Sequence, residues 1–270
     1  MLPEINFNLL FSGYQDTPNL WSDELETLHQ FGLPKTNSPY KAPKPIPRLR
    51  LGKWVEQFAK HQIDSDPSCK LIAESLQIRK EKQTIGELDF LFKFKSQLIH
   101  LEVVYKFYLY NHTKSYKTDL EHWIGPNRTD SLMLKLDKLK TKQLPLLHHP
   151  TTRDYLDSLK VKSDECLQKV QFKAQLFVPL KHLDLDIGDL NKRCISGFYL
   201  NLNDINLFKD FEIYLPTKLE WLAQPHNNVN WGSFDNALKT IEDQCQSHRS
   251  PMIWLKDPEH NVQKAFVTWW

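Results

Sequence analysis

Hydrophobic and polar residues alternate along the segment from Gly86 to Phe107. One face is apolar and consists of Leu88, Phe90, Phe92 and Phe94, followed by Ile99, Leu101, Val103, Tyr105 and Phe107. The opposite face carries charged and polar residues, namely Glu87, Asp89, Lys93, His100, Glu102 and Lys106. A period of two predicts β-strands, so the segment is expected to form two strands with one apolar and one chemically active face.

The residues between the two strands set the register of a hairpin. If Lys95 and Ser96 form a two-residue turn, Phe94 pairs with Gln97, and Asp89 then lies opposite Glu102. Like charges that face each other across a ladder destabilise a sheet. A cation bound between the two acids would remove that repulsion. Lys106 lies on the same face, roughly 13 Å along the strand from Glu102.

The neighbouring segments predict the core elements around this hairpin. Apolar residues at helical spacing predict a helix over 50–61, with Glu56 on its less apolar flank. The predicted strands are 71–79, 85–94, 97–110 and 172–180, and a helix capped by Asp130 is expected before the last of them. The order is therefore helix, three strands, helix, strand, which indicates a mixed α/β fold.

The ends of the chain are predicted to be additions to this core. Ser22 is a plausible N-cap for a short helix through Leu28, and the proline-rich stretch 39–47 excludes regular structure. In the C-terminal part, short strands are predicted at 195–202, 211–215, 252–255 and 265–269, with a helix over 233–245. The expected organisation is an N-terminal arm and linker (1–47), a core (48–180) and a C-terminal extension or lobe (181–270).

Composition narrows the class of protein. Hydrophobic residues make up 40% and charged residues 25% of the 270 residues, as in a globular protein. No apolar run approaches the roughly 20 residues of a membrane span, and the N-terminus does not resemble a secretory signal, so a cytoplasmic location without membrane association is expected. The four cysteines lie far apart, which argues against structural zinc. A net charge of +2 neither requires nor excludes a polyanionic partner. Nothing indicates the oligomeric state.

Opposed carboxylates with a nearby lysine suit one kind of chemistry particularly well. Carboxylate oxygens bind Mg²⁺ or Mn²⁺, and the ion activates a water molecule beside a phosphodiester, while a lysine stabilises the developing charge. The alternative is a solvated sheet face, on which glutamate and lysine are common.

The order of the elements and the Asp89, Glu102 and Lys106 pattern together resemble the PD-(D/E)XK restriction-endonuclease-like superfamily. More closely, the chain resembles a bacterial family of unknown function counted as a remote member of that superfamily. The segments that carry this resemblance are Arg50–Gly52, Thr84–Phe90, His100–Leu109, Trp123–Asn127 and Lys218–Leu222. The resemblance implies a restriction-endonuclease-like core in which Asp89 and Glu102 bind the metal and the first helix adds Glu56. Val104 stands where the superfamily places its lysine, and Lys106 is the candidate to replace it.

Several further residues are candidates with more than one interpretation each. Glu87 is either a further metal ligand or a surface group. His100 contacts a phosphate, orients Glu102, or is an ordinary hydrogen-bonded strand residue. The stripe of Lys135, Lys138 and Lys142 either follows a nucleic-acid backbone or is a solvated helix face, and Lys135 or Lys138 could also reach the acids.

Three hypotheses on function follow. The first is a divalent-metal-dependent nuclease that acts on DNA or RNA. The second is a catalytically inactive module of the same fold that binds nucleic acid or a protein partner. The third treats the hairpin as scaffold and the tryptophan-rich C-terminal region as the working surface, with Trp221 and Trp254 among the candidates for stacking on unpaired bases.

Overall fold

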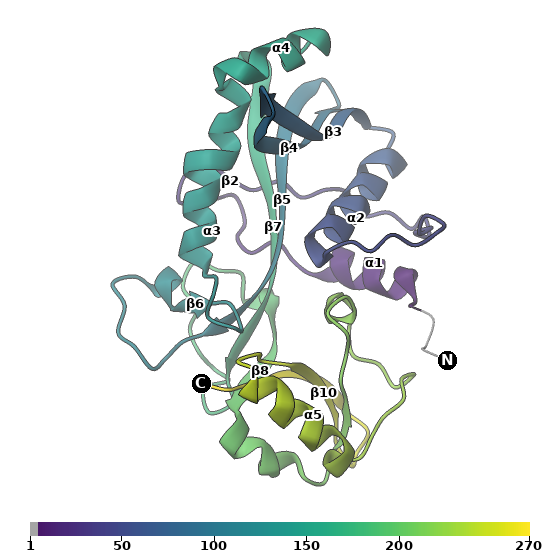
Figure 1. Cartoon of the computed structure of the whole chain (residues 1–270), viewed down its shortest axis with the longest axis vertical. Coiled ribbons are helices and arrows are strands. Elements are labelled where there is room, and N and C mark those ends of the chain that lie inside the picture. The colour runs from purple at the N-terminus through teal and green to yellow at the C-terminus, as the bar shows by residue number, and fades with distance from the viewer. Residues whose placement is uncertain (1–4) are drawn as a thin grey trace. The chain divides into compact units, whose positions relative to one another are not determined.

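The computed structural model describes residues 5–270 and shows a mixed α/β fold (Figure 1). A large mixed sheet has the strand order β3-β4-β5-β7-β8-β11-β10-β9, and the short β6 pairs with β5. Its strands are β3 (Cys69–Lys80), β4 (Gln83–Phe94), β5 (Gln97–Tyr110), β6 (Trp123–Ile124), β7 (Cys166–Pro179), β8 (Ile195–Asn201), β9 (Glu212–Tyr214), β10 (Met252–Lys256) and β11 (Val262–Thr268). The pairs β7 with β8 and β8 with β11 are parallel, whereas β3, β4 and β5 pair in antiparallel fashion.

The chain divides into two compact units, each assembled from separate segments. Unit 1 combines the segment up to Pro18 with Lys106–Met133 and Ala174–Trp270, and unit 2 combines Asn19–Tyr105 with Leu134–Lys173. The long strands β5 and β7 each contribute residues to both units.

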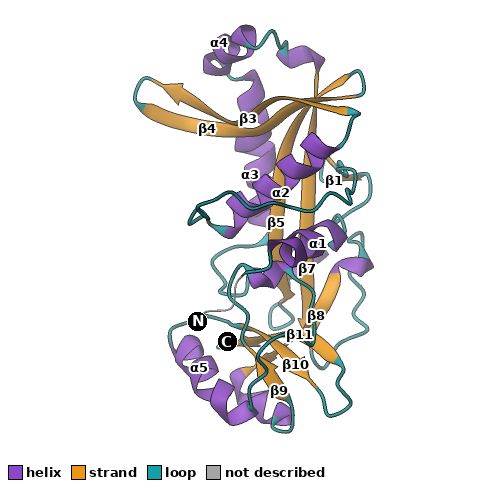
Figure 2. Cartoon of the chain, turned by 90° about the vertical axis from the view of Figure 1, so that its right-hand side faces the viewer, coloured by secondary structure: helices purple, strands orange, loops and turns teal. Residues whose placement is uncertain are grey.

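Unit 2 contains the predicted hairpin. β4 and β5 pair in the expected register, with Phe94 opposite Gln97, and Lys95 in the turn has a positive φ of 57°. β3 pairs along the other side of β4, so that β3 and β4 form a long two-stranded ribbon (Figure 2). Apolar residues of these strands pack against the segment that follows α3; the cluster is Ile78, Leu88, Leu91, Leu98, Leu146, Leu147, Leu156 and Val161.

The predicted helix 50–61 is α2 (Leu51–Ser65), which packs on β3. Its buried residues recur at helical spacing and are Trp54, Val55, Phe58, Ala59, Gln62 and Ile63. Glu56 therefore lies beside the buried stripe, with a side chain that is 14% exposed.

The second core helix is less regular than the sequence predicts. α3 covers only Leu132–Lys138, followed by a π-helix (η2, Leu139–Gln143), a 3-10 helix (η3, Leu144–His148) and α4 (Pro150–Ser158). Pro145 and Pro150 lie within the first two positions of η3 and α4, where a missing backbone N–H is tolerated. This irregular path brings Gln143 toward β5.

The predicted helix after Ser22 is wrong. The segment instead forms a two-stranded hairpin of β1 (Glu24–Leu25) and β2 (Leu28–His29), because Glu26 and Thr27 adopt positive φ angles of 52° and 67°. Leu25 and Leu28 are both buried, and their spacing of three satisfies a tight hairpin as well as a helix. The helix of the N-terminal region is α1 (Phe7–Asp16), capped by the Asn6 side chain. The proline-rich stretch 39–47 is free of helix and strand, as predicted.

Unit 1 holds the C-terminal strands and α5 (Phe234–Gln246), which covers the sheet formed by β8, β11, β10 and β9 (Figure 1). All four predicted strands and the predicted helix are present, with ends shifted by up to three residues. β8 and β11 approach closely at Gly197, where an added Cβ would lie 2.1 Å from the carbonyl oxygen of Lys264. Short 3-10 helices connect the elements of both units: η1 (Asp119–His122), η4 (Ser163–Glu165), η5 (Lys192–Cys194), η6 (Leu202–Phe208) and η7 (Glu220–Leu222).

Within residues 5–270, no helix has the length and apolar character that crossing a membrane requires.

Candidate functional site

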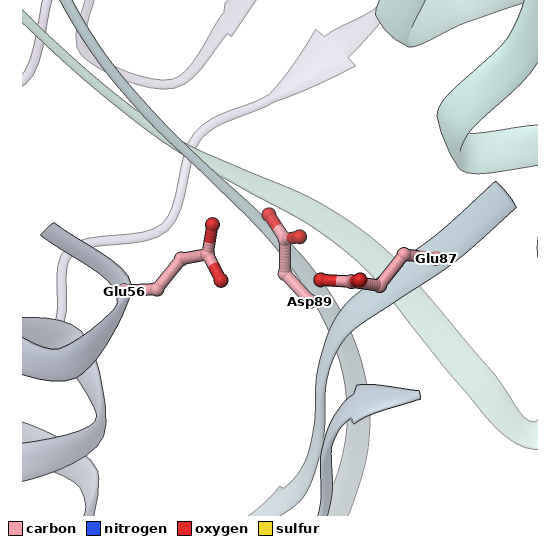
Figure 3. Close-up of side chains that lie close together, drawn as sticks. All are labelled: Glu56, Glu87 and Asp89. Carbon is pink, nitrogen blue, oxygen red and sulfur yellow. The ribbon is translucent and has the colours of Figure 1, made fainter. Parts of the chain in front are cut away.

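Three acidic side chains converge in unit 2. α2 contributes Glu56, and β4 contributes Glu87 and Asp89, which are two residues apart and so extend to the same side of the strand (Figure 3). One carboxylate oxygen of each lies within 4.8 Å of the others. The structure thus brings together three of the four acids that the sequence predicts as metal ligands.

Lys53 lies beside this cluster and forms ion pairs with two of its members. Its Nζ lies 2.6 Å from Glu56 and 2.5 Å from Glu87. Burial by itself would lower the pKa of Lys53, but the hydrogen bonds and charges of the two carboxylates raise it above its usual value. A side chain of this protein therefore supplies positive charge to the acids.

Asp89 is the most buried member of the cluster, with 9% of its surface exposed. Burial, followed by the charges of Glu102 and Glu56, raises the pKa of Asp89 well above its usual range. Its Oδ2 accepts a 2.9 Å hydrogen bond from the backbone N–H of Val103 on β5, which partly offsets that cost.

Glu102 is fully buried and is not one of the three converging acids. Several hydrogen-bond donors hold its carboxylate instead. Its Oε1 lies 3.1 Å from Nε2 of His100, its Oε2 accepts a 2.5 Å bond from Nε2 of Gln143, and its carboxylate also accepts from the backbone N–H of Asp89. The pairs of the β4–β5 ladder end at Phe90 and Leu101, one pair before Asp89 and Glu102. Beyond that point, each carboxylate takes a backbone N–H of the opposite strand, which explains how two acids are accommodated at neighbouring positions.

The protonation of His100 follows from its neighbours. Nε2 of Gln168 donates to the carbonyl oxygen of Leu144 and lies 3.3 Å from Nδ1 of His100. Because a carbonyl only accepts, this amide nitrogen is a donor, so Nδ1 accepts and Nε2–H donates to Glu102. Burial lowers the pKa of His100 to about 4, so the ring is neutral at pH 7.

Lys135 extends this chain of hydrogen bonds to a charged group. Its Nζ donates a 2.6 Å bond to Oε1 of Gln143, which places the amide nitrogen of Gln143 toward Glu102. Burial raises the pKa of Glu102 to about 7, and the charge of Lys135 acts in the opposite direction. Lys135, Gln143, His100 and Gln168 together orient one buried carboxylate.

The remaining predicted residues have other surroundings. Lys106 donates to Asp130 at 2.5 Å within unit 1. Lys138 and Lys142 are exposed, whereas Lys135 is half-buried, so the predicted lysine stripe does not share one environment. His100 is fully buried and orients Glu102, which was one of its three predicted roles, rather than presenting its ring to solvent.

The burial of the acids also excludes one interpretation of the hairpin. Asp89 is 9% exposed and Glu102 is 0% exposed, so these two acids do not lie on a solvated sheet face. β5 is buried on both sides over most of its length, because other elements cover the face that the alternation predicts to be polar.

Sequence reasoning missed Lys53, Gln143 and Gln168. Lys53 precedes Glu56 by three residues on one helix, which is a spacing that could have been recognised. Gln143 and Gln168 are 41 and 68 residues from their partners Glu102 and His100. No local pattern connects such positions.

The fold and the site together define a mixed α/β protein with a largely buried cluster of three acids and, on β5, the buried carboxylate of Glu102. The chain belongs to the family described as Domain of unknown function (DUF1853), which matches residues 14–266. Comparison with curated proteins and with solved structures found no match.

Proposed function

We propose that the chain is a divalent-metal-dependent phosphodiesterase that cleaves DNA or RNA, with Glu56, Glu87 and Asp89 as the ligands of Mg²⁺ or Mn²⁺. The observation that carries the proposal is the convergence of these three carboxylates within 4.8 Å on the first helix and the second core strand. Hard divalent cations prefer carboxylate oxygens, and a partly buried site with excess negative charge favours their binding. The donor set fits such an ion.

The order of the core elements supports the same proposal. α2 is followed by β3, β4 and β5, then by the helical segment that begins with α3, and then by β7. This is the order expected for the restriction-endonuclease-like core, in which the second strand brings an aspartate and the third a glutamate. Asp89 and Glu102 occupy those strands.

The other residues have distinct roles in this proposal. When bound, the metal ion supplies an activated water molecule and neutralises charge on the phosphate. Glu102 is fixed by His100 and Gln143 so that its carboxylate keeps one orientation. Positive charge near the site comes from Lys53 and, through Gln143, from Lys135. Lys106 remains the residue that the sequence pattern proposes in place of the superfamily's lysine. Lys138 and Lys142, which are exposed, are available to a nucleic-acid backbone.

A second function is favoured by one observation. Lys53 satisfies Glu56 and Glu87 without a metal ion. Together with Val104 in place of the expected lysine, this supports an inactive module that keeps the fold to bind nucleic acid or a protein.

The two functions are separated by a cleavage assay with Mg²⁺ or Mn²⁺ on plasmid, single-stranded DNA and RNA. Asp89→Asn and Glu56→Gln should each reduce cleavage by at least about 100-fold, because each removes a charged ligand from the site. Glu165→Gln is the matched control, since Glu165 is an exposed acid of unit 2. Wild-type protein that binds these substrates yet cleaves none of them would establish the inactive module instead.

Lys53→Met tests whether Lys53 and the metal ion compete for the same carboxylates. We expect the metal-free variant to melt at a lower temperature, because Glu56 and Glu87 then lack their ion-pair partner, and we expect a larger Mn²⁺-induced rise than in wild type. Thermal denaturation with and without Mn²⁺ measures both effects. Lys60→Met is a suitable control, because Lys60 also pairs with acids from α2 and β3 but lies outside the cluster. An Mn²⁺ response equal to that of wild type would show that Lys53 does not compete.

A further inference from the structure

A cavity of about 520 Å³ in unit 1 is lined by two basic side chains. Its lining includes Lys218, Arg249 and Trp221, together with the polar side chains Asn127, Thr217, Thr240, Gln244 and Ser250. Among the described residues 5–270, the lining contains no aspartate or glutamate. Two of the segments that carry the family resemblance, 123–127 and 218–222, meet at this cavity, yet neither contributes to the acidic site.

Lys218 is held by aromatic rings instead of by an acid. Its Nζ lies 3.3 Å from the ring centroid of Trp221 and 5.3 Å from that of Phe107. Such cation–π contacts fix the position of an ammonium group without neutralising its charge. Within residues 5–270, neither Lys218 nor Arg249 forms an ion pair with a carboxylate.

A third basic side chain, that of Lys106, acts on Lys218. Burial, followed by the charge of Lys106, lowers the pKa of Lys218 to about 7, so a bound anion would favour the ammonium form of Lys218 over the neutral amine. Lys106 is itself paired with Asp130. Hydrogen bonds connect parts of the rim: Ser250 donates its hydroxyl to the carbonyl of Pro126 and its backbone N–H to the side chain of Asn127.

We propose that this cavity binds the phosphoryl group of a nucleotide or of a nucleic-acid strand, with Lys218 and Arg249 as its charged ligands. A phosphoryl group has the negative charge and the acceptor oxygens that two cations and several hydroxyl and amide groups can satisfy. Base stacking is not part of the proposal. Trp221 is only 9% exposed and Trp254 1% exposed, and Lys218 already lies over the Trp221 ring, so the stacking surface considered from the sequence is absent at these two residues.

Binding to the full-length protein in EDTA tests the proposal independently of catalysis. The probes are labelled 12-nucleotide DNA and RNA strands, with adenosine monophosphate as a competitor. The double variant Lys218→Met/Arg249→Gln should weaken binding by at least about tenfold, because two phosphate contacts are lost. For the same reason, the number of counterions released on binding, which is measured from the slope of log K against log salt concentration, should fall by about one to two. The matched control is Lys239→Met/Arg193→Gln, which removes the same charge from exposed positions of unit 1.

The outcomes are distinct. If adenosine monophosphate displaces the labelled strands, the ligand of the cavity is a nucleotide. If the strands bind and adenosine monophosphate does not displace them, the ligand is a phosphodiester group of a strand. Equal loss of binding in both double variants would overturn the proposal, because it would show non-specific attraction to the whole charge of the protein. If the double variant unfolds, Arg249→Gln alone serves, since Arg249 is exposed. The binding assay does not depend on the cleavage assay. If Asp89→Asn had no effect on cleavage, the conclusion about phosphoryl binding at this cavity would stay the same.

Discussion

Asp89→Asn should raise the melting temperature of the metal-free protein at pH 8 and should abolish its response to Mn²⁺. Burial and the charges of Glu102 and Glu56 raise the pKa of Asp89 in the folded state above its ordinary 3.8. The folded protein therefore binds more protons than the unfolded chain between these two pKa values, and its stability falls as the pH rises through that window. Asparagine removes this cost and still offers an oxygen to the N–H of Val103.

Thermal denaturation at pH 5 and pH 8, with and without Mn²⁺, measures both parts of this prediction. The gain from Asp89→Asn should be larger at pH 8 than at pH 5. With free Mn²⁺ at about 100 times the dissociation constant, wild type and the control Glu165→Gln should gain about 2.7 kcal/mol, whereas Asp89→Asn should gain almost nothing. An equal Mn²⁺ response in all three proteins would contradict metal binding at Asp89.

The second large effect is expected at Lys264 in unit 1, far along the chain from the acids. Lys264 on β11 is 1% exposed, and its Nζ donates to Oε1 of Gln175 at 2.8 Å and to the carbonyl of Trp221 at 3.1 Å. Both acceptors are uncharged, and burial lowers the pKa of Lys264 from 10.5 to about 7. Between these two values the unfolded chain binds more protons than the folded protein, so this lysine makes stability rise with pH.

Lys264→Met should therefore be favourable at low pH and unfavourable at high pH relative to wild type. The change in unfolding free energy caused by the substitution should differ by about 4 kcal/mol between pH 6 and pH 10. The lost hydrogen bonds cost about 1–3 kcal/mol at both pH values and cancel from this difference. Urea denaturation at the two pH values measures it, and Lys239→Met, at an exposed position of α5, is the control. A pH-independent effect would mean that the ammonium of Lys264 is solvated.

The acidic site combines two features that point to different functions. Three carboxylates lie close enough to share a cation, and Lys53 already provides one for two of them. In the proposed enzyme Lys53 gives up these contacts when the metal ion binds, whereas in an inactive module it keeps them permanently. The Mn²⁺ response of Lys53→Met therefore bears on both hypotheses, and the cleavage assay decides between them.

The hairpin illustrates what can be predicted from local sequence. The alternation from Gly86 to Phe107 and the turn at Lys95 predicted both strands and their register, because strand periodicity and turn length are local properties. The same reasoning failed at Leu25 and Leu28, since a spacing of three residues fits a helix and a tight hairpin equally well. The alternation also predicted one polar face, but it carries no information on what covers that face.

The site could be predicted only in part for the same reason. Glu87 and Asp89 were candidates because they are acids on the polar face of a predicted strand, and Glu56 was a candidate because the family resemblance implies an acid on the first helix. The partners of Glu102 were not, because Gln143 reaches it only through the π-helical path of η2 and Lys135 acts through Gln143. These partners orient Glu102, whose charge also acts on Asp89.

The sequence by itself determined the order of the core elements, the hairpin register and the acidic residues near its polar face. These depend on hydrophobic period and turn chemistry, which act over a few residues. Only the tertiary structure decided which acids share a site, which one is held by neutral hydrogen-bond donors, and that Lys53 pairs with two of them. Such choices depend on contacts between segments tens of residues apart, and burial then sets the pKa of each group according to the partners that those contacts supply.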